Sequence, residues 1–452
     1  MTTSTHDGHQ IEESYSKSTI SANWRSKLMN RVLQALLNLT PAFFSLTMGT
    51  GIVSILLYDF PFSAHWLRVL AVVIFVFNVV LFLVLLFANI ARFVIWKGLF
   101  AATLTHPVAS MFWGTLPMGL ITLVNMTALS CVPDGGIAWA RLALGLWWID
   151  IILSVVINLG IVYIMFTRQR HTPETMAAIW LLPIVSCVVA AASGGVVSNA
   201  IMPYMPQLAR STVIVAYIIY GIGVPLAMFV ITIFLHRTVV YGFPAPATLT
   251  TLYLPLGPCG QGSFGMVVLG KTVRKLAYEY DIGFTIAPAG ALSSEIASGA
   301  MRRVADAIYA GGIITSLILW GLGFCWYVFA TTSLIDHWWH EDRSYFGRQS
   351  FSVGFTALTF PIGVWATAST ALAIELDSWA FKIIGAVVSL QVVFNWSYVM
   401  VYTLYKAYDG TIFVAPELSQ FVDKTPSLRW ESRSERDKEI ARDQRGIGSY
   451  RV

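Results

Sequence analysis

Apolar runs of about 20 residues recur along the chain, which is the length a helix needs to cross the hydrocarbon core of a bilayer. Only 12% of the residues are charged, against roughly one quarter in soluble domains. The sequence therefore predicts an all-α polytopic membrane protein. We place the predicted spans, ten in number, at 38–58, 67–91, 107–130, 140–166, 176–199, 212–236, 248–270, 303–335, 350–373 and 380–405.

These spans divide the chain into three parts. We expect a polar tail over 1–37, a ten-helix transporter domain over 38–408 and a charged tail over 409–452. An even number of spans places both tails on one side of the membrane, and the excess of lysine and arginine there predicts that this side is cytoplasmic. One connection departs from that rule, because its basic residues fall on the predicted outer side: Lys271, Arg274, Lys275, Arg302 and Arg303.

Helix breakers are unevenly distributed among the spans. Small residues cluster in the odd-numbered spans, as in LPLGPCGQGSFG over 254–265, and Pro225 is the one proline found in an even-numbered span. Freed backbone groups are tolerated in a membrane only where protein or water covers them. The pattern predicts five inner helices around a shared axis and five outer helices against lipid, although small residues also serve simple close packing. The prolines of the odd-numbered spans are Pro41, Pro107, Pro117, Pro183, Pro255, Pro258 and Pro361.

The predicted axis suits an anion. Backbone amides freed at proline bends point partial positive charge inward, and the odd-numbered spans are nearly free of charged side chains. Weak neutral groups attract an anion well enough to admit it and loosely enough to release it. Each hydroxyl or amide could instead satisfy the backbone of its own helix. We expect the lining to include Thr47, Thr50, Thr115, Pro117, Ser193, Gly260, Gln261, Ser263, Thr359 and Pro361.

Two ionisable residues are further candidates. His106 stands at the start of the third span, where it either attracts an anion or caps the helix. Asp150 is the only acidic residue well inside a span, and an intramembrane carboxylate is a functional hypothesis by default. It either carries a coupling proton or pairs with a nearby basic residue. Its place on an even-numbered span favours the pair.

The sequence lacks the patterns of a membrane enzyme. Its cysteines lie singly, without the paired spacing of a zinc or redox site. It has no phosphate-binding loop and no nucleophile beside an evident base. We therefore expect no catalytic residue, no metal, no cofactor and no nucleic-acid partner.

Four segments resemble the tellurite-resistance/dicarboxylate transporter family. That family includes bacterial tellurite-resistance proteins, fungal sulfite efflux pumps and plant slow anion channels. The patterns GTLPMG and GPxGQGxFG are similar to those of the sulfite branch. The four segments are LTPAFFSLTMGTGIVS (39–54), THPVASMFWGTLPMGL (105–120), LPLGPCGQGSFGMVVLG (254–270) and FTALTFPIGVWATAS (355–369).

The resemblance implies a fold and a gate. The fold is five helical hairpins around a central pore, with odd helices inside and even helices outside, in a homotrimer with one pore per subunit. The gate is a phenylalanine in the ninth span that blocks the pore, and Phe360 in LTFPIG is the matching position. Phe360 is also one of 27 phenylalanines, and simple packing against a neighbour is the alternative.

The function implied is export of sulfite or bisulfite across the plasma membrane. An inside-negative potential is worth about 2.3 kcal/mol per charge per 100 mV and expels anions, so export needs no coupled ion. The alternatives are a proton-coupled malate or C4-dicarboxylate permease and a less selective channel for nitrate or chloride. Import of a dicarboxylate would need protons, and the odd-numbered spans offer no evident group to carry them.

Overall fold

The computed structural model describes residue 29 and residues 31–284, 294–340 and 351–418, and this part of the chain contains helices but no strand. Within it, eight helical runs are long and apolar enough to cross a membrane. The all-helical, multi-span architecture predicted from the sequence is therefore confirmed. Most of the two predicted tails, over 1–28 and 419–452, lies outside the described residues.

The eight runs do not match the ten predicted spans one for one. A single run, Ala109–Arg168, contains both the third and the fourth predicted spans. The helix α9 (Leu256–Glu279), which covers most of the seventh, is not among the eight. Its glycines and its charged C-terminal turns make it less apolar than the other long helices.

One set of helices is buried along most of its length. Each member is preceded in the chain by a 3-10 helical segment. The buried helices are α2 (Phe44–Tyr58), α5 (Thr115–Met126), α7 (Leu181–Ile201), α9 and α11 (Phe360–Glu375). The 3-10 segments are η1 (Pro41–Phe43), η2 (Ala109–Gly114), η4 (Ala178–Trp180), η5 (Pro246–Tyr253) and η6 (Val353–Leu358).

The prolines of the odd-numbered spans lie where these helices start. Pro117, Pro183 and Pro258 are each the third residue of an inner helix, and Pro361 is the second residue of α11. Proline is favoured in the first turn of an α-helix, because its fixed φ suits the helix and its missing N–H removes at most one bond to the preceding segment. The prolines, predicted within or at the start of the odd-numbered spans, therefore mark the junctions between 3-10 and α-helix inside continuous helical runs.

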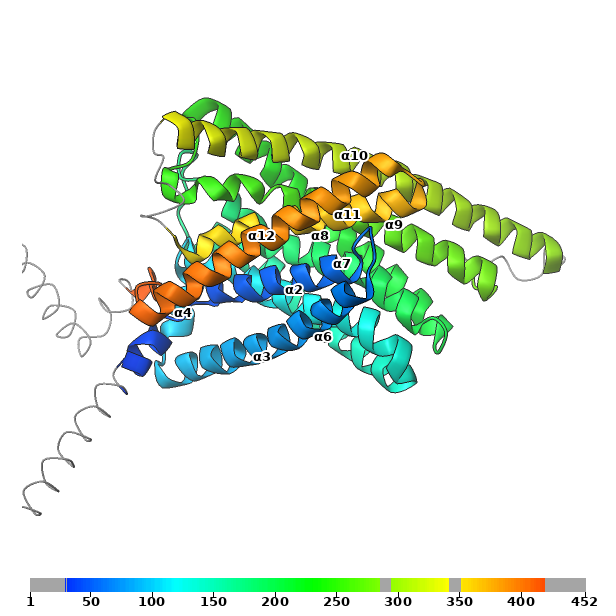
Figure 1. Cartoon of the computed structure of the whole chain (residues 1–452), viewed down its shortest axis with the longest axis horizontal. Helices are drawn as coiled ribbons and strands as arrows, with labels where there is room; N and C mark the ends of the chain where they lie inside the picture. Colours follow the sequence, from blue (N-terminus) through cyan, green and yellow to red (C-terminus); the bar gives the residue numbers. More distant parts are fainter. Residues whose placement is uncertain (1–28, 30, 285–293, 341–350, 419–452) are drawn as a thin grey trace, which may run out of the picture.

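Longer helices alternate with the buried ones along the chain. They are α3 (His65–Ile95), α6 (Val132–Arg168), α8 (Pro206–Tyr241), α10 (Ser294–His340) and α12 (Trp379–Asp409), with short α4 (Leu99–Thr105) and η3 (Thr127–Cys131) as connections. In the most apolar stretch of α3, 22% of the residues are buried, against 89% in η1 and α2. Figure 1 shows α3 and α10 along opposite margins of the molecule, with α2 and α7 between them. Burial therefore alternates as the breaker pattern predicted.

The inner helices contact one another in chain order. α2 packs on α5, α5 on α7, α7 on α9 and α9 on α11, and α11 returns to α2. Glycines permit this approach: a Cβ at Gly260 would lie 2.6 Å from the backbone nitrogen of Trp365, and one at Gly114 would lie 2.2 Å from the carbonyl oxygen of Leu182. The contacts form a closed cycle in which these glycines serve close packing.

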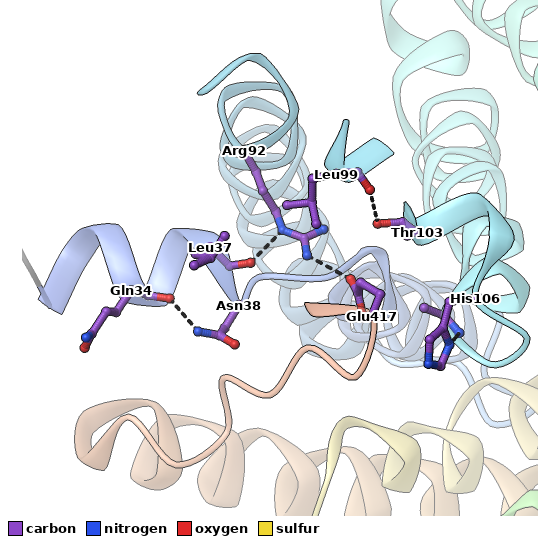
Figure 2. A network of polar contacts seen from close by, with 9 residues as sticks. Gln34, Leu37, Asn38, Arg92, Leu99, Thr103, His106 and Glu417 are labelled. Atoms are coloured by element: carbon purple, nitrogen blue, oxygen red, sulfur yellow. Dashed lines mark hydrogen bonds and ion pairs between the residues drawn. The ribbon is translucent and has the colours of Figure 1, made fainter. Parts of the chain in front are cut away.

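A buried ion pair holds the end of α12 near the start of the fold, where the first and last described segments meet (Figure 1). Arg92 of α3 donates from Nη2 to Oε1 of Glu417 at 2.8 Å and from Nε to the carbonyl oxygen of Leu37 at 2.8 Å (Figure 2). Phe413 stacks on Phe43 with ring centroids 5.7 Å apart. The segment after α12 is therefore fixed against the turn that leads into α2.

Candidate functional site

Two cavities lie along the cycle of inner helices. The small cavity, of about 50 Å³, is lined by every inner helix at its N-terminal end. The large cavity, of about 730 Å³, is lined by the same helices toward their C-terminal ends. The two cavities therefore occupy successive levels of one axis.

The small cavity is surrounded by helix N-termini. The first or second residue of each inner helix lines it, namely Ser45, Thr115, Leu181, Gly257 and Phe360. The first N–H groups of these α-helices bond back into the turn before them, as from Gly257 to the carbonyl oxygen of Leu254 at 2.9 Å, and each helix dipole points its positive end toward this side. Most other lining side chains are apolar, such as Met48 and Phe112. The arrangement attracts an anion without a fixed cation that would trap it.

A short septum separates the two cavities. On α9 the lining of the small cavity ends at Gly257 and that of the large cavity begins at Gln261, four residues or about 6 Å along the helix axis. Phe360, with 3% of its surface exposed, lines the small cavity at the start of α11. Ile52 of α2 packs on Gly363 of α11, where a Cβ would lie 2.5 Å from Cγ1 of Ile52. Phe360 therefore stands on the small-cavity side of this septum.

The large cavity carries charges that sequence reasoning did not place in the site. Nζ of Lys271 lies 2.5 Å from Oε1 of Glu375, and Tyr309 donates to Oε2 of Glu375 at 2.7 Å. Arg68 and Asp59 line the same cavity, so the formal charges of these four lining residues cancel. The basic residues near the C-terminal end of α9 and the start of α10 were recognised only as an exception to the charge rule. Sequence reasoning missed that Lys271 lies at the same level as Glu375, the last residue of α11.

Most of the threonine candidates bond to their own helical turn, which was the alternative weighed from the sequence. A hydroxyl that donates to a backbone carbonyl satisfies the turn and keeps only lone pairs to offer. The bonds are Thr47 to Phe44 at 2.7 Å, Thr50 to Leu46 at 2.8 Å, Thr115 to Phe112 at 2.6 Å and Thr359 to Thr356 at 2.6 Å.

The structure brings some of the predicted residues to the cavities and leaves others outside. Thr115, Phe360 and Pro361 line the small cavity, and Gln261 lines the large one. Ser263 lies 2.7 Å from the hydroxyl of Ser316 on α10, away from the axis. The residues that line neither cavity are Thr47, Thr50, His106, Pro117, Asp150, Ser193, Gly260, Ser263 and Thr359.

His106 has the contacts of a helix cap. Its Nδ1 accepts hydrogen bonds from the backbone N–H groups of Val108 at 3.2 Å and Ala109 at 3.1 Å. Burial lowers the pKa of His106, so the ring is neutral at pH 7 and Nδ1 is free to accept. These contacts agree with the capping alternative.

Asp150 is fully buried in α6 without a basic partner. In the described part of the chain its one hydrogen bond comes from Ser154 Oγ, 3.5 Å from Oδ2, and its Oδ1 has none. No ion pair within the described ranges includes Asp150. The favoured pairing with a basic residue is therefore absent among the described residues, because Asp150 lies half-way along α6, near Cys187 of α7.

Comparisons with known proteins agree with an anion pathway. The family model described as voltage-dependent anion channel matches residues 38–404. Sulfite efflux pumps of Arthroderma benhamiae and Trichophyton rubrum are each 36% identical over 405 residues, which covers 90% of this chain and 98% of theirs. The malic acid transport protein of Schizosaccharomyces pombe is 23% identical over 384 residues, covering 83% of this chain and 80% of its own. These matches confirm the resemblance carried by the four sequence segments.

Proposed function

Because the chain belongs to the voltage-dependent anion channel family, we propose that it exports sulfite and bisulfite through a pore on the axis of its inner helices. The sulfite efflux pumps of Arthroderma benhamiae and Trichophyton rubrum are 36% identical to it, whereas the malic acid transport protein is 23% identical. This difference favours sulfite over a dicarboxylate as the substrate. The names of these relatives also favour a transporter over an enzyme.

One observation carries the pore proposal. The N-terminal ends of all the inner helices line the small cavity, and an anion at this point interacts with several helix dipoles at once. These dipoles act more strongly in a site that excludes water. In this proposal Phe360 is the gate, and Thr115, Pro361 and Gln261 line the pathway on either side of it.

The proposed topology has ten spans as five hairpins over 38–408. We include α9 as a span although it is less apolar, because a helix shielded from lipid by protein does not need an apolar surface. In this topology both termini are cytoplasmic, the small cavity faces the cytoplasm and the large cavity opens outside. The protein lies in the plasma membrane as a homotrimer with one pore per subunit, and its exposed apolar side chains on α3, α8, α10 and α12 contact lipid.

Expression in a sulfite-sensitive cell tests the substrate. A potential of 100 mV is worth about 2.3 kcal/mol for a monoanion, which permits up to about a 50-fold lower concentration inside than outside. We expect cells that express the chain to hold several-fold less internal sulfite than control cells after the same exposure, and to grow at higher sulfite concentrations. Labelled malate uptake is measured in the same cells as the control. Proton-dependent malate uptake with unchanged internal sulfite would establish the dicarboxylate permease instead.

A further inference from the structure

The large cavity begins at the septum with one residue from each of four inner helices, α2, α5, α9 and α11, and we call these residues the septal ring. An anion that has passed Phe360 meets the septal ring before any charged side chain of this cavity. On α9, for example, Lys271 lies ten residues beyond Gln261, about 15 Å along the helix. The members of the ring are Ile52, Asn125, Gln261 and Thr367.

The polar members of the septal ring offer both donors and acceptors. Thr367 donates its hydroxyl to the carbonyl oxygen of Val364 at 2.8 Å, so only its lone pairs remain for a ligand. The side-chain amides of Asn125 and Gln261 have no hydrogen-bond partner in the described part of the chain, and both residues line the cavity. Each amide presents NH₂ donors and a carbonyl acceptor. The ring therefore suits a ligand that both accepts and donates hydrogen bonds.

This property separates the available anions. Nitrate and chloride accept hydrogen bonds but donate none, whereas bisulfite accepts through its oxygens and donates its own proton. A site that pairs with a substrate hydroxyl disfavours analogues that lack it, because its acceptors then lose that direct hydrogen bond. We infer that the septal ring selects an oxyanion that still carries a proton, so that the exported species is bisulfite. This inference rests on the proposed export of sulfite and bisulfite.

The absence of charge from the septal ring favours a monoanion. In the Born treatment the cost of moving an ion out of water grows with the square of its charge, so the sulfite dianion costs about four times as much as bisulfite. Two amides and one hydroxyl cannot offset that difference as a lysine or arginine in the ring would. The ring thus disfavours the dianion on charge and the simple monoanions on hydrogen bonding.

Fluxes through the full-length chain in liposomes test the inference. Sulfite-plus-bisulfite flux and nitrate flux are measured at one potential, across the pH range in which bisulfite loses its proton. The ratio of the two fluxes at each pH cancels the titration of the protein itself, including the charged residues that line the same cavity: Asp59, Arg68, Lys271 and Glu375. We expect the ratio to rise as pH falls, in proportion to the bisulfite fraction.

Substitution of Thr367 locates the selectivity. Thr367→Val preserves the shape of the side chain and removes the acceptor, and we expect the flux ratio at low pH to fall about tenfold. Thr367→Ser restores the hydroxyl and should restore the ratio. Thr272→Val is the matched control, because Thr272 is equally backbone-bonded, at 2.8 Å to Val268, but lines neither cavity. The ratio should be unchanged in that variant.

Either of two results would overturn the inference and leave the proposed function standing. One is a flux ratio that rises with pH, and the other is a flux ratio in Thr367→Val equal to that of the wild type. If Thr367→Val moves no anion at all, the flux ratio of Gln261→Leu is compared with that of the wild type instead. This variant is suitable because the Gln261 amide has no hydrogen bond to the described protein. A wild-type chain that moves nitrate or malate, but no sulfite or bisulfite at any pH, would instead overturn the proposed function and the inference with it.

Discussion

Replacing Phe360 with alanine is expected to raise the anion current at least about tenfold, the effect of lowering a barrier by only ~1.4 kcal/mol. The ring of Phe360 lines the small cavity where the septum begins, and its removal opens space toward the large cavity. The current is measured in oocytes or planar bilayers with nitrate or bisulfite as the charge carrier. The control is Phe87→Ala on α3, where the side chain is 63% exposed on the outer surface.

The currents of Phe360→Ala, Phe87→Ala and the wild type are compared at equal surface expression. Phe87→Ala should leave the current at the wild-type level, because Phe87 is remote from both cavities. A current in Phe360→Ala equal to that of the wild type would show that Phe360 only packs against its neighbours. The gate would then have to be sought elsewhere in the septum.

Gly260→Ala is expected to reduce the amount of folded protein sharply. The added Cβ would lie 2.6 Å from the backbone nitrogen and 2.7 Å from the Cα of Trp365, and a backbone cannot turn aside as a side chain can. Overpacking of this kind costs about 1–3 kcal/mol and separates the elements in contact, here α9 and α11. The thermal midpoint and the monodisperse fraction of the detergent-purified protein measure the effect.

The matched control is the same substitution at Gly221 on α8. No atom lies within 4 Å of the Cβ that would be added there, and alanine is favoured over glycine in a helix by about 1 kcal/mol. The midpoint of Gly221→Ala should therefore stay the same or rise while that of Gly260→Ala falls. Equal shifts in the two variants would contradict the close packing of the inner helices.

Much of the fold could be predicted because lipid restricts the solutions so strongly. Span length revealed most of the membrane helices, and the distribution of proline and glycine separated buried from exposed helices. The exact place of the prolines, at the junctions between 3-10 and α-helix, was not predicted. A proline such as Pro117 is tolerated both at a bend and in the first turn of a helix, and sequence alone does not separate the two.

The site was predictable only in part, for a related reason. Phe360 and Gln261 were identified from the sequence, whereas Asn125 and Thr367 were not. A helix buried on all sides shows no amphipathic pattern, so its sequence does not indicate which face meets the cavity. Hydroxyl groups were ambiguous as well: Thr47 and Thr359 donate to their own helical turns, and no sequence feature separates them from Thr115 at the small cavity.

Blocking the proposed pathway at Gln261 tests the central claim most directly, namely that the inner helices enclose a single anion route. A charged, membrane-impermeant thiol reagent is applied from outside to cells carrying Phe360→Ala with Gln261→Cys, since Gln261 lines the large cavity. The account predicts that the reagent abolishes the current, whereas Phe360→Ala alone keeps it. Cys187 and Cys259 are buried, and the more accessible Cys131 and Cys325 line neither cavity. A current that persists in full after Gln261→Cys has been labelled would contradict the account.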